Sequence, residues 1–233
     1  MKIVSIHQPS YFPWLGLLDK IAKTNTFILL DDAQVVKGSY QYRNIFYCNG
    51  EKKFLTLPIN YKLGITFKEI KLKNNKWKVE HLNKLYNYYR RAPYFNEVYQ
   101  AVENLLQKDY DDGLDLLKDT MLFAMEKLDI NVSFLISSQY NVQGVKGDKV
   151  LGLCKAVGAQ IYLAGQGSRE YMSEYLHKFN EAGIEVKWHN FRHPFYNQVK
   201  GNPFIDGLSC LDIFFFEGFE NSKKIFWENI KNG

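Results

Sequence analysis

The first fifty residues contain a dense group of side chains that could do acid–base chemistry. His7 follows a short apolar segment, residues 2–6, and Asp31 and Asp32 follow a second one, residues 26–30. Histidine exchanges protons near neutral pH, and a neighbouring carboxylate orients its ring and raises its affinity for a proton. We therefore predict a catalytic centre in which His7 carries the proton and Asp31 orients it.

Two short strands must position these side chains. Parallel strands of an open α/β sheet bind ligands beyond their carboxyl ends, so we expect the two strand ends to share one pocket. The segments that follow the strands supply candidate substrate-binding residues, which are Gln8, Tyr11, Trp14, Lys37, Gln41, Arg43 and Asn44. A structural interpretation stays open, because His7 could cap a loop and the aspartates could begin a turn.

A later strand, residues 160–163, leads into a turn of small and polar residues. Such a turn at the start of a helix presents free backbone N–H groups and the positive end of the helix dipole to an anion. The turn predicts a phosphate site made of Gly165, Gln166, Gly167, Ser168 and Arg169. It matches neither GxxxxGK[ST] nor GxGxxG, and the alternative that its glycines serve only a turn stays open.

Two further segments add candidate ligand-binding residues. Asp148 and Lys149 open another predicted helix, with Asp148 as its N-cap and Lys149 facing the ligand. His193 lies in an aromatic segment after the predicted strand 185–188, and this segment could form a lid. The proline after His193 argues against a helix that would align it with His189 on a metal, so we predict no metal site.

The periodicity of apolar residues predicts an α/β fold. Alternating strands and helices in the last hundred residues indicate a mostly parallel sheet with flanking helices, and Asn49-Gly50 predicts an N-terminal β-hairpin. We expect one domain, residues 1–233, in which residues 76–128 form a helical insertion or subdomain. The expected strands are 2–6, 26–30, 45–48, 53–57, 66–72, 132–136, 160–163 and 185–188. The expected helices are 77–91, 95–106, 114–128, 148–157 and 170–182, with a helical tail over 211–216 and 222–230.

Composition limits the class of protein. A chain of 233 residues with 46% hydrophobic content suits a packed globule. The net charge of +5 favours an anionic ligand, but the basic residues are spread along the chain and give no strong nucleic-acid signal. We predict a cytoplasmic protein, because we see neither a signal peptide nor a run of the ~18 apolar residues that a membrane span needs. Three scattered cysteines predict neither a disulfide framework nor a zinc cluster.

Several motifs together resemble the WbqC-like protein family, and the resemblance covers nearly the whole chain. They are HQPSYFPWLG at 7–16, LDDAQ at 30–34, the 37–44 segment ending in Arg43-Asn44, GDK at 147–149, YLAGQGS at 162–168 and LSCLD at 208–212. The family is typically encoded among genes for O-antigen and other surface polysaccharides. It usually has an aliphatic residue at the position of Asp32, which implies that Asp31 is the functional carboxylate.

The resemblance and these residues together suggest a transferase that moves an acyl or aminoacyl group onto the amine of a nucleotide-linked amino sugar. His7 would be the general base, and Arg43, Lys149 and Arg169 would hold phosphates. An acyl carrier or another protein could bring the donor. One alternative is a nucleotidyl- or adenylate-transferring enzyme that uses ATP or CTP, with Asp31 near Mg²⁺. Another is a non-catalytic protein that binds sugar nucleotides.

Overall fold

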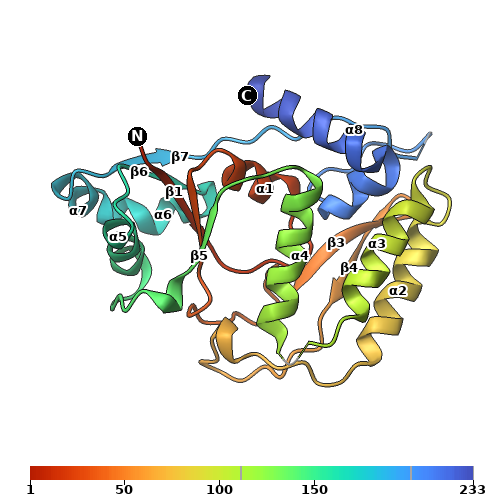
Figure 1. Cartoon of the computed structure of the whole chain (residues 1–233), viewed down its shortest axis with the longest axis horizontal. Helices are drawn as coiled ribbons and strands as arrows, with labels where there is room; N and C mark the ends of the chain where they lie inside the picture. Colours follow the sequence, from red (N-terminus) through yellow and green to blue (C-terminus); the bar gives the residue numbers. More distant parts are fainter. Residues whose placement is uncertain (111, 200, 233) are drawn as a thin grey trace.

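The computed structural model describes residues 1–110, 112–199 and 201–232, and it is an α/β structure built on a five-stranded parallel sheet. The strand order is β5-β2-β1-β6-β7, and every neighbouring pair is parallel (Figure 1). The five strands are β1 (Ile3–His7), β2 (Thr26–Leu29), β5 (Ser133–Ile136), β6 (Ile161–Ala164) and β7 (Glu185–Trp188). The predicted fold class is confirmed.

The order in which the chain adds strands to the sheet reverses between β1 and β6. From β1 the chain adds β2 and then β5 on one side, and it returns to add β6 and β7 on the other side. Ile3 of β1 pairs with Ile161 of β6, while Ser5 of β1 pairs with Phe27 of β2. Ligands bind at such a switch point in open α/β sheets, beyond the carboxyl ends of the strands.

Helices cover both faces of the sheet, because alternate strand side chains point to opposite faces. Val4, Ile6 and Ile28 pack into a core with α5, α6 and α7, whereas Phe27 and Leu29 pack into a larger core with α1, α4 and α8. Figure 1 shows the first group of helices at the left, α4 near the middle, and α2 and α3 at the right. The helices are α1 (Leu15–Ala22), α2 (Lys76–Tyr89), α3 (Phe95–Gln107), α4 (Gly113–Lys127), α5 (Lys146–Ala156), α6 (Arg169–Met172), α7 (Leu176–Glu181) and α8 (Cys210–Asn232).

The predicted hairpin is present and contributes to the larger core. Strands β3 (Arg43–Cys48) and β4 (Glu51–Thr56) pair antiparallel around Asn49 and Gly50, whose φ angles are 50° and 84°. Positive φ at both turn positions is what the Asn-Gly pair provides. The hairpin and α2, α3 and α4 share one hydrophobic core with α1 and α8.

The prediction of a strand at 66–72 is wrong. Residues Phe67–Glu69 form a short 3₁₀ helix, and only isolated bridges, such as the one between Ile59 and Leu72, occur around it. The backbone N–H of Thr66 donates to the Glu69 carboxylate at 2.9 Å, which closes a capping box. Phe67 and Ile70 are both buried, and this three-residue spacing fits a helical turn better than an alternating strand.

Two other helical segments differ in detail from the prediction. The expected helix over 170–182 is divided into α6, a 3₁₀ turn at Ser173–Tyr175 and α7. The Ser173 hydroxyl donates to the Glu170 carbonyl, and such local bonds compete with the regular helical ladder. Helix α8 is kinked at Gly218, where φ is 70° and a Cβ atom would lie 2.7 Å from the ring of Tyr94.

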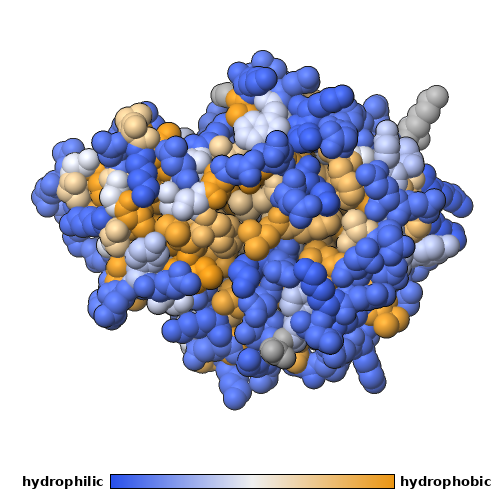
Figure 2. Space-filling model, in the orientation of Figure 1, coloured by the Kyte–Doolittle hydropathy of each residue, from blue (hydrophilic) through white to orange (hydrophobic). Residues whose placement is uncertain are grey.

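The surface carries a band of hydrophobic residues across the face shown in Figure 2, where β5 and α4 lie in Figure 1. No helix in the described parts of the chain is long and apolar enough to cross a membrane.

Candidate functional site

The carboxyl ends of β1 and β6 enclose a cavity of about 390 Å³, which we call the switch-point cavity. It brings the loop after β1 together with the glycine turn after β6, two segments that are far apart in the sequence. The polar and glycine residues that line it are His7, Gln8, Lys20, Gly165, Gly167 and Ser168. Five of these six were predicted from the sequence to bind or transform a ligand, and Lys20 was not.

Lys20 is a buried cation of this cavity, with 4% of its surface exposed. Its Nζ donates to the Ile6 carbonyl at 3.0 Å, and a Cβ atom on Gly165 would lie 3.8 Å from Nζ. Burial lowers the pKa of Lys20 to about 8. No carboxylate among the described residues forms an ion pair with it. A buried charge without a counter-ion is costly, so this site favours an anionic ligand.

His7 is held by a backbone carbonyl and not by a carboxylate, which corrects the prediction. Its Nδ1 lies 2.8 Å from the Gln8 carbonyl oxygen. Because a carbonyl only accepts, Nδ1 carries the hydrogen and Nε2 carries the lone pair. Burial, with a further contribution from the charge of Lys20, lowers the pKa of His7 to about 3. The ring is therefore neutral at neutral pH.

His7 also lines a second cavity, of about 400 Å³, which we call the aromatic cavity. Its other predicted residues are Trp14, Gln41 and Asn44, and its apolar lining includes Leu17, Tyr40 and Ile45. Trp14 is 40% exposed, and its ring lies over Gly16 and contacts the ring of Phe191 edge-on, with 5.3 Å between the ring centroids. The imidazole of His7 thus belongs to two cavities of different chemistry.

The WbqC-like protein family model matches residues 8–224 of this chain. The chain belongs to the WbqC-like protein family. A protein of Mycobacterium tuberculosis (strain ATCC 25618 / H37Rv) named "Uncharacterized protein Rv1507c" is 29% identical over 224 residues, which cover 94% of this chain and 96% of the mycobacterial one. The matched residues 8–224 include strands β2 to β7, helices α1 to α7 and, apart from Ile6 and His7, the lining residues of both cavities.

Asp31 of this WbqC-like protein is a buried anchor between β2 and the segment after β5. Its Oδ1 accepts from the Ser137 hydroxyl at 2.8 Å and from the Ser138 N–H at 2.9 Å, and its Oδ2 accepts from the Ser138 hydroxyl at 2.6 Å. Asp31 lines neither cavity, contrary to the prediction that it orients His7. Because these donors occupy both oxygens, Asp31 is also poorly placed to hold Mg²⁺.

Asp32 and Lys149 form an ion pair of 2.7 Å beside this anchor. Partial burial tends to raise the pKa of Asp32, but hydrogen bonds from Lys149 and Ser137 outweigh it and hold this pKa below its usual value. Lys149 also donates to the Val142 carbonyl at 2.6 Å. Lys149 is thus neutralised within the protein and does not line either cavity, which corrects its predicted contact with the ligand.

The prediction that Asp148 is the N-cap of α5 is wrong. The N-cap position is Val145, and Asp148 lies in the first turn, where it pairs with Lys178 at 2.7 Å. The carboxylate still lies near the positive end of the helix dipole, which is a favourable position. It is exposed and lines neither cavity.

Two predicted binding residues, Tyr11 and Asn44, shape the loop that follows His7. The Asn44 amide donates to the carbonyls of Tyr11 and Phe12 at 3.1 and 2.6 Å and accepts from the Ile45 N–H at 2.8 Å. These bonds hold Phe12 at a φ of 41°. Tyr11 is fully buried, and its hydroxyl bonds His81 Nδ1 at 2.9 Å. Tyr11 is therefore not accessible to a ligand.

The remaining predicted residues lie outside both cavities. The Arg43 guanidinium lies over the ring of Phe54 at 4.3 Å, and Lys37 is exposed. Arg169 lies over the ring of Trp188, with 5.2 Å from its Cζ to the ring centroid. His193 Nδ1 donates to the Pro194 carbonyl at 2.9 Å. The structure thus groups the glycine turn with Lys20 and not with these four residues.

Gln166 joins the glycine turn to a buried contact between His189 and Asp19 that sequence reasoning missed. Its amide donates to the His189 carbonyl at 2.9 Å, and His189 Nε2 lies 2.5 Å from Asp19 Oδ1. Asp19 and Lys20 are consecutive on α1, so this pair holds the segment after β7 against the helix that carries Lys20. The available signal was a pair of charged residues inside the otherwise apolar pattern of α1, both of them buried.

Proposed function

We propose that this protein is a transferase that acylates the amine of a nucleotide-linked amino sugar in the assembly of a surface polysaccharide. The observation that carries the proposal is the position of His7 between two cavities of different chemistry. A transferase needs two substrates held on either side of one proton-transferring group, and such positioning supplies much of the rate enhancement.

The switch-point cavity suits the diphosphate of a sugar nucleotide. Lys20 supplies a buried positive charge, and Gly165 and Gly167 allow phosphate oxygens to approach the backbone closely. The helix after the turn, α6, has only four residues, so its dipole contributes little. In this proposal Lys20 replaces Arg43, Lys149 and Arg169 as the main phosphate-binding residue.

The aromatic cavity suits the acyl donor. Trp14, Leu17 and Ile45 give it an apolar wall, and Lys52 provides a cation at the same cavity. Binding sites for small molecules typically combine an apolar lining with a few polar groups that set orientation. An acyl chain would bury its carbon atoms against this wall, with the carbonyl carbon directed toward His7.

His7 would carry the proton of the reaction. The neutral amine of the sugar attacks the acyl carbonyl carbon, a C–N bond forms, and the bond to the donor breaks with its electron pair on the leaving group. The proton of the amine passes to His7 Nε2 and then to the leaving group. The low pKa of His7 leaves Nε2 unprotonated at neutral pH, so its lone pair is free to accept this proton.

The direct test is product formation by the purified protein. Nucleotide-linked amino sugars would be incubated with a panel of acyl-CoA donors, and N-acylated product would be measured by mass spectrometry. We expect His7→Ala to lower kcat by about 100-fold or more, because removal of a general base costs that much, while the melting-temperature shift caused by the sugar nucleotide persists. The matched control is His177→Ala, because His177 is exposed and lies outside both cavities.

Other outcomes would contradict the proposal. Unchanged turnover by His7→Ala would show that His7 is not the base. Pyrophosphate release with ATP or CTP and Mg²⁺ would indicate nucleotidyl transfer. Sugar-nucleotide binding without product from any donor, including protein-borne ones, would indicate an accessory binding protein.

A further inference from the structure

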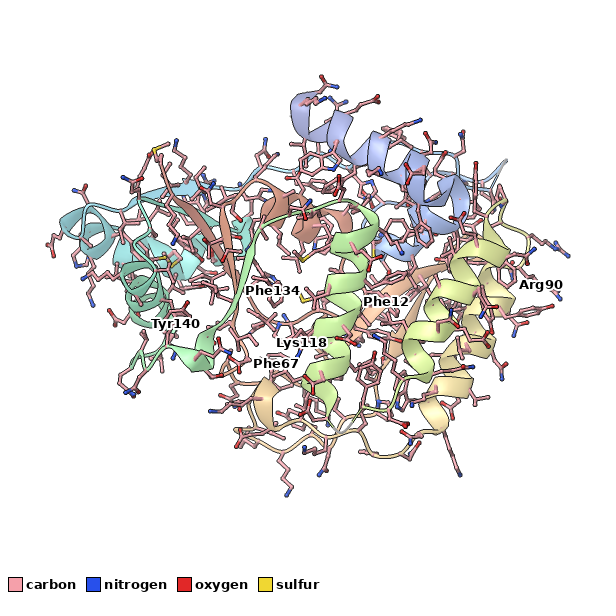
Figure 3. The ribbon with its side chains drawn as sticks, in the orientation of Figure 1. Phe12, Phe67, Arg90, Lys118, Phe134 and Tyr140 are labelled. Carbon is pink, nitrogen blue, oxygen red and sulfur yellow. The ribbon has the colours of Figure 1, made fainter. Side chains whose placement is uncertain are left out.

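A third cavity, of about 630 Å³, lies away from His7 at the junction of the hairpin turn, the end of α2 and the segment after β7. The turn contributes Tyr47 and Asn49, and the end of α2 contributes Asn87, Tyr88, Arg90 and Arg91. Figure 3 shows Arg90 at the right edge of the molecule, beyond α2 and α3, whereas Tyr140 lies at the left beside α5. The cavity is therefore separate from the sheet switch point and shares no lining residue with the two cavities of the candidate site.

The charge of this cavity is positive. Arg90 and Arg91 line it, and no Asp or Glu does. Within the described parts of the chain neither arginine forms an ion pair, and Arg90 lies only at the margin of the Tyr86 ring, 6.0 Å from its centroid. A guanidinium presents N–H donors in a planar fork that matches a carboxylate or a phosphate.

The remaining lining is rich in amides and aromatic rings. The side chains of Asn49, Asn87 and Asn197 have no hydrogen-bond partner among the described residues, so their donors and acceptors are available to a ligand. Asn202 is already anchored, because its amide donates to the buried Tyr47 hydroxyl at 2.6 Å. The rings of Tyr88 and Phe216 line the same cavity and offer apolar surface.

We propose that this cavity binds an anionic saccharide, meaning a sugar that carries a carboxylate or a phosphate. The arginines would bind the anion, the free amides would bind hydroxyl groups, and the rings would pack on the apolar face of the sugar. The volume lies within the range of small-molecule sites. This inference does not depend on the chemistry proposed for His7.

The test measures binding of four probes by isothermal titration calorimetry: glucuronic acid, glucose 1-phosphate, glucose and inorganic phosphate. We expect one or both anionic sugars to bind at least about tenfold more tightly than glucose and phosphate. The double variant Arg90→Ala/Arg91→Ala should lower that affinity at least about tenfold. Arg192→Ala, which removes an exposed arginine outside the cavity, is the matched control, and its affinity should stay within about twofold of the parent.

Each result decides one part of the proposal. Binding of only one anionic sugar identifies the anion that the cavity prefers. The proposal is overturned if neither sugar binds at about 10 mM, if phosphate binds as tightly as glucose 1-phosphate, or if the double alanine variant binds like the parent. If that variant does not fold, Arg90→Lys/Arg91→Lys keeps the charge but loses the planar fork, and it should still weaken binding several-fold.

Discussion

Lys20 and His7 line the same cavity, and the charge of Lys20 adds to the effect of burial in lowering the pKa of His7. The two side chains come from consecutive elements, α1 and the end of β1, and the Lys20 ammonium is held by the carbonyl of Ile6, the residue before His7. Any change at Lys20 therefore alters both the proposed anion site and the proton affinity of the ring.

Replacement of Lys20 by methionine should raise the pKa of His7. The cation that opposes protonation is removed, but burial remains, so the pKa should rise from about 3 and stay below the ordinary value of 6.5. NMR titration of the His7 ring measures this directly. An unchanged His7 pKa would show that the two groups are not coupled.

The same substitution should weaken sugar-nucleotide binding at least about tenfold, because a buried charge-assisted contact to phosphate is lost. Lys155→Met is the matched control, because Lys155 is an exposed lysine of α5 outside both cavities of the candidate site. Equal affinity in Lys20→Met and the parent would mean that the phosphates bind elsewhere.

Stability should depend on pH through Lys20. Its folded pKa is about 8, below the ordinary value of 10.5, so the unfolded chain binds more protons between these values. Stability therefore rises with pH across this window, by up to about 3 kcal/mol relative to Lys20→Met. Denaturant unfolding of both proteins at pH 7.5 and pH 10.5 measures the difference. A constant difference would contradict the lowered pKa.

Asp212 should give a pH dependence of the opposite sign. Burial raises its pKa to about 6, although the hydroxyls of Tyr196 and Tyr89 and the Gln198 amide donate to it. A raised folded pKa means that this stabilisation is fully present below pH 3.8 and is lost as the pH rises through 6. Relative to Asp212→Asn, the parent should lose about 3 kcal/mol between pH 3.5 and pH 7. Asp206→Asn, at an exposed site, is the control and should show no such trend.

Asp31 and Asp32 should differ in their effect on stability. Asp31→Ala leaves the N–H and the hydroxyl of Ser138 without their buried acceptor and should lower the free energy of unfolding by about 2–4 kcal/mol. Asp32→Ala breaks a partly exposed pair with Lys149 and should cost about 1 kcal/mol or less. Urea unfolding of the two variants measures both values. Equal losses would contradict the anchoring role of Asp31.

Local patterns in the sequence determined most of the secondary structure and the parallel sheet. The strand at residues 185–188 agrees with β7, and the predicted hairpin turn has the positive φ angles that Asn49 and Gly50 allow. His7 and the glycines of the turn were identified because strand ends and glycine turns are local features. The prediction of a strand at 66–72 was wrong because three apolar residues in a short segment fit either a strand or a helical turn.

The tertiary structure decided which charged residues reach a ligand. Asp31 is occupied by Ser137 and Ser138, more than one hundred residues away in the chain, and Lys149 is occupied by Asp32. Lys20, which looks like a surface residue of a short helix, is buried because α1 packs against the carboxyl end of β1. Periodicity shows which face of an element is buried, but it does not show which groups lie opposite that face. Hydrogen bonding and charge compensation with those groups determine which side chains remain available for function.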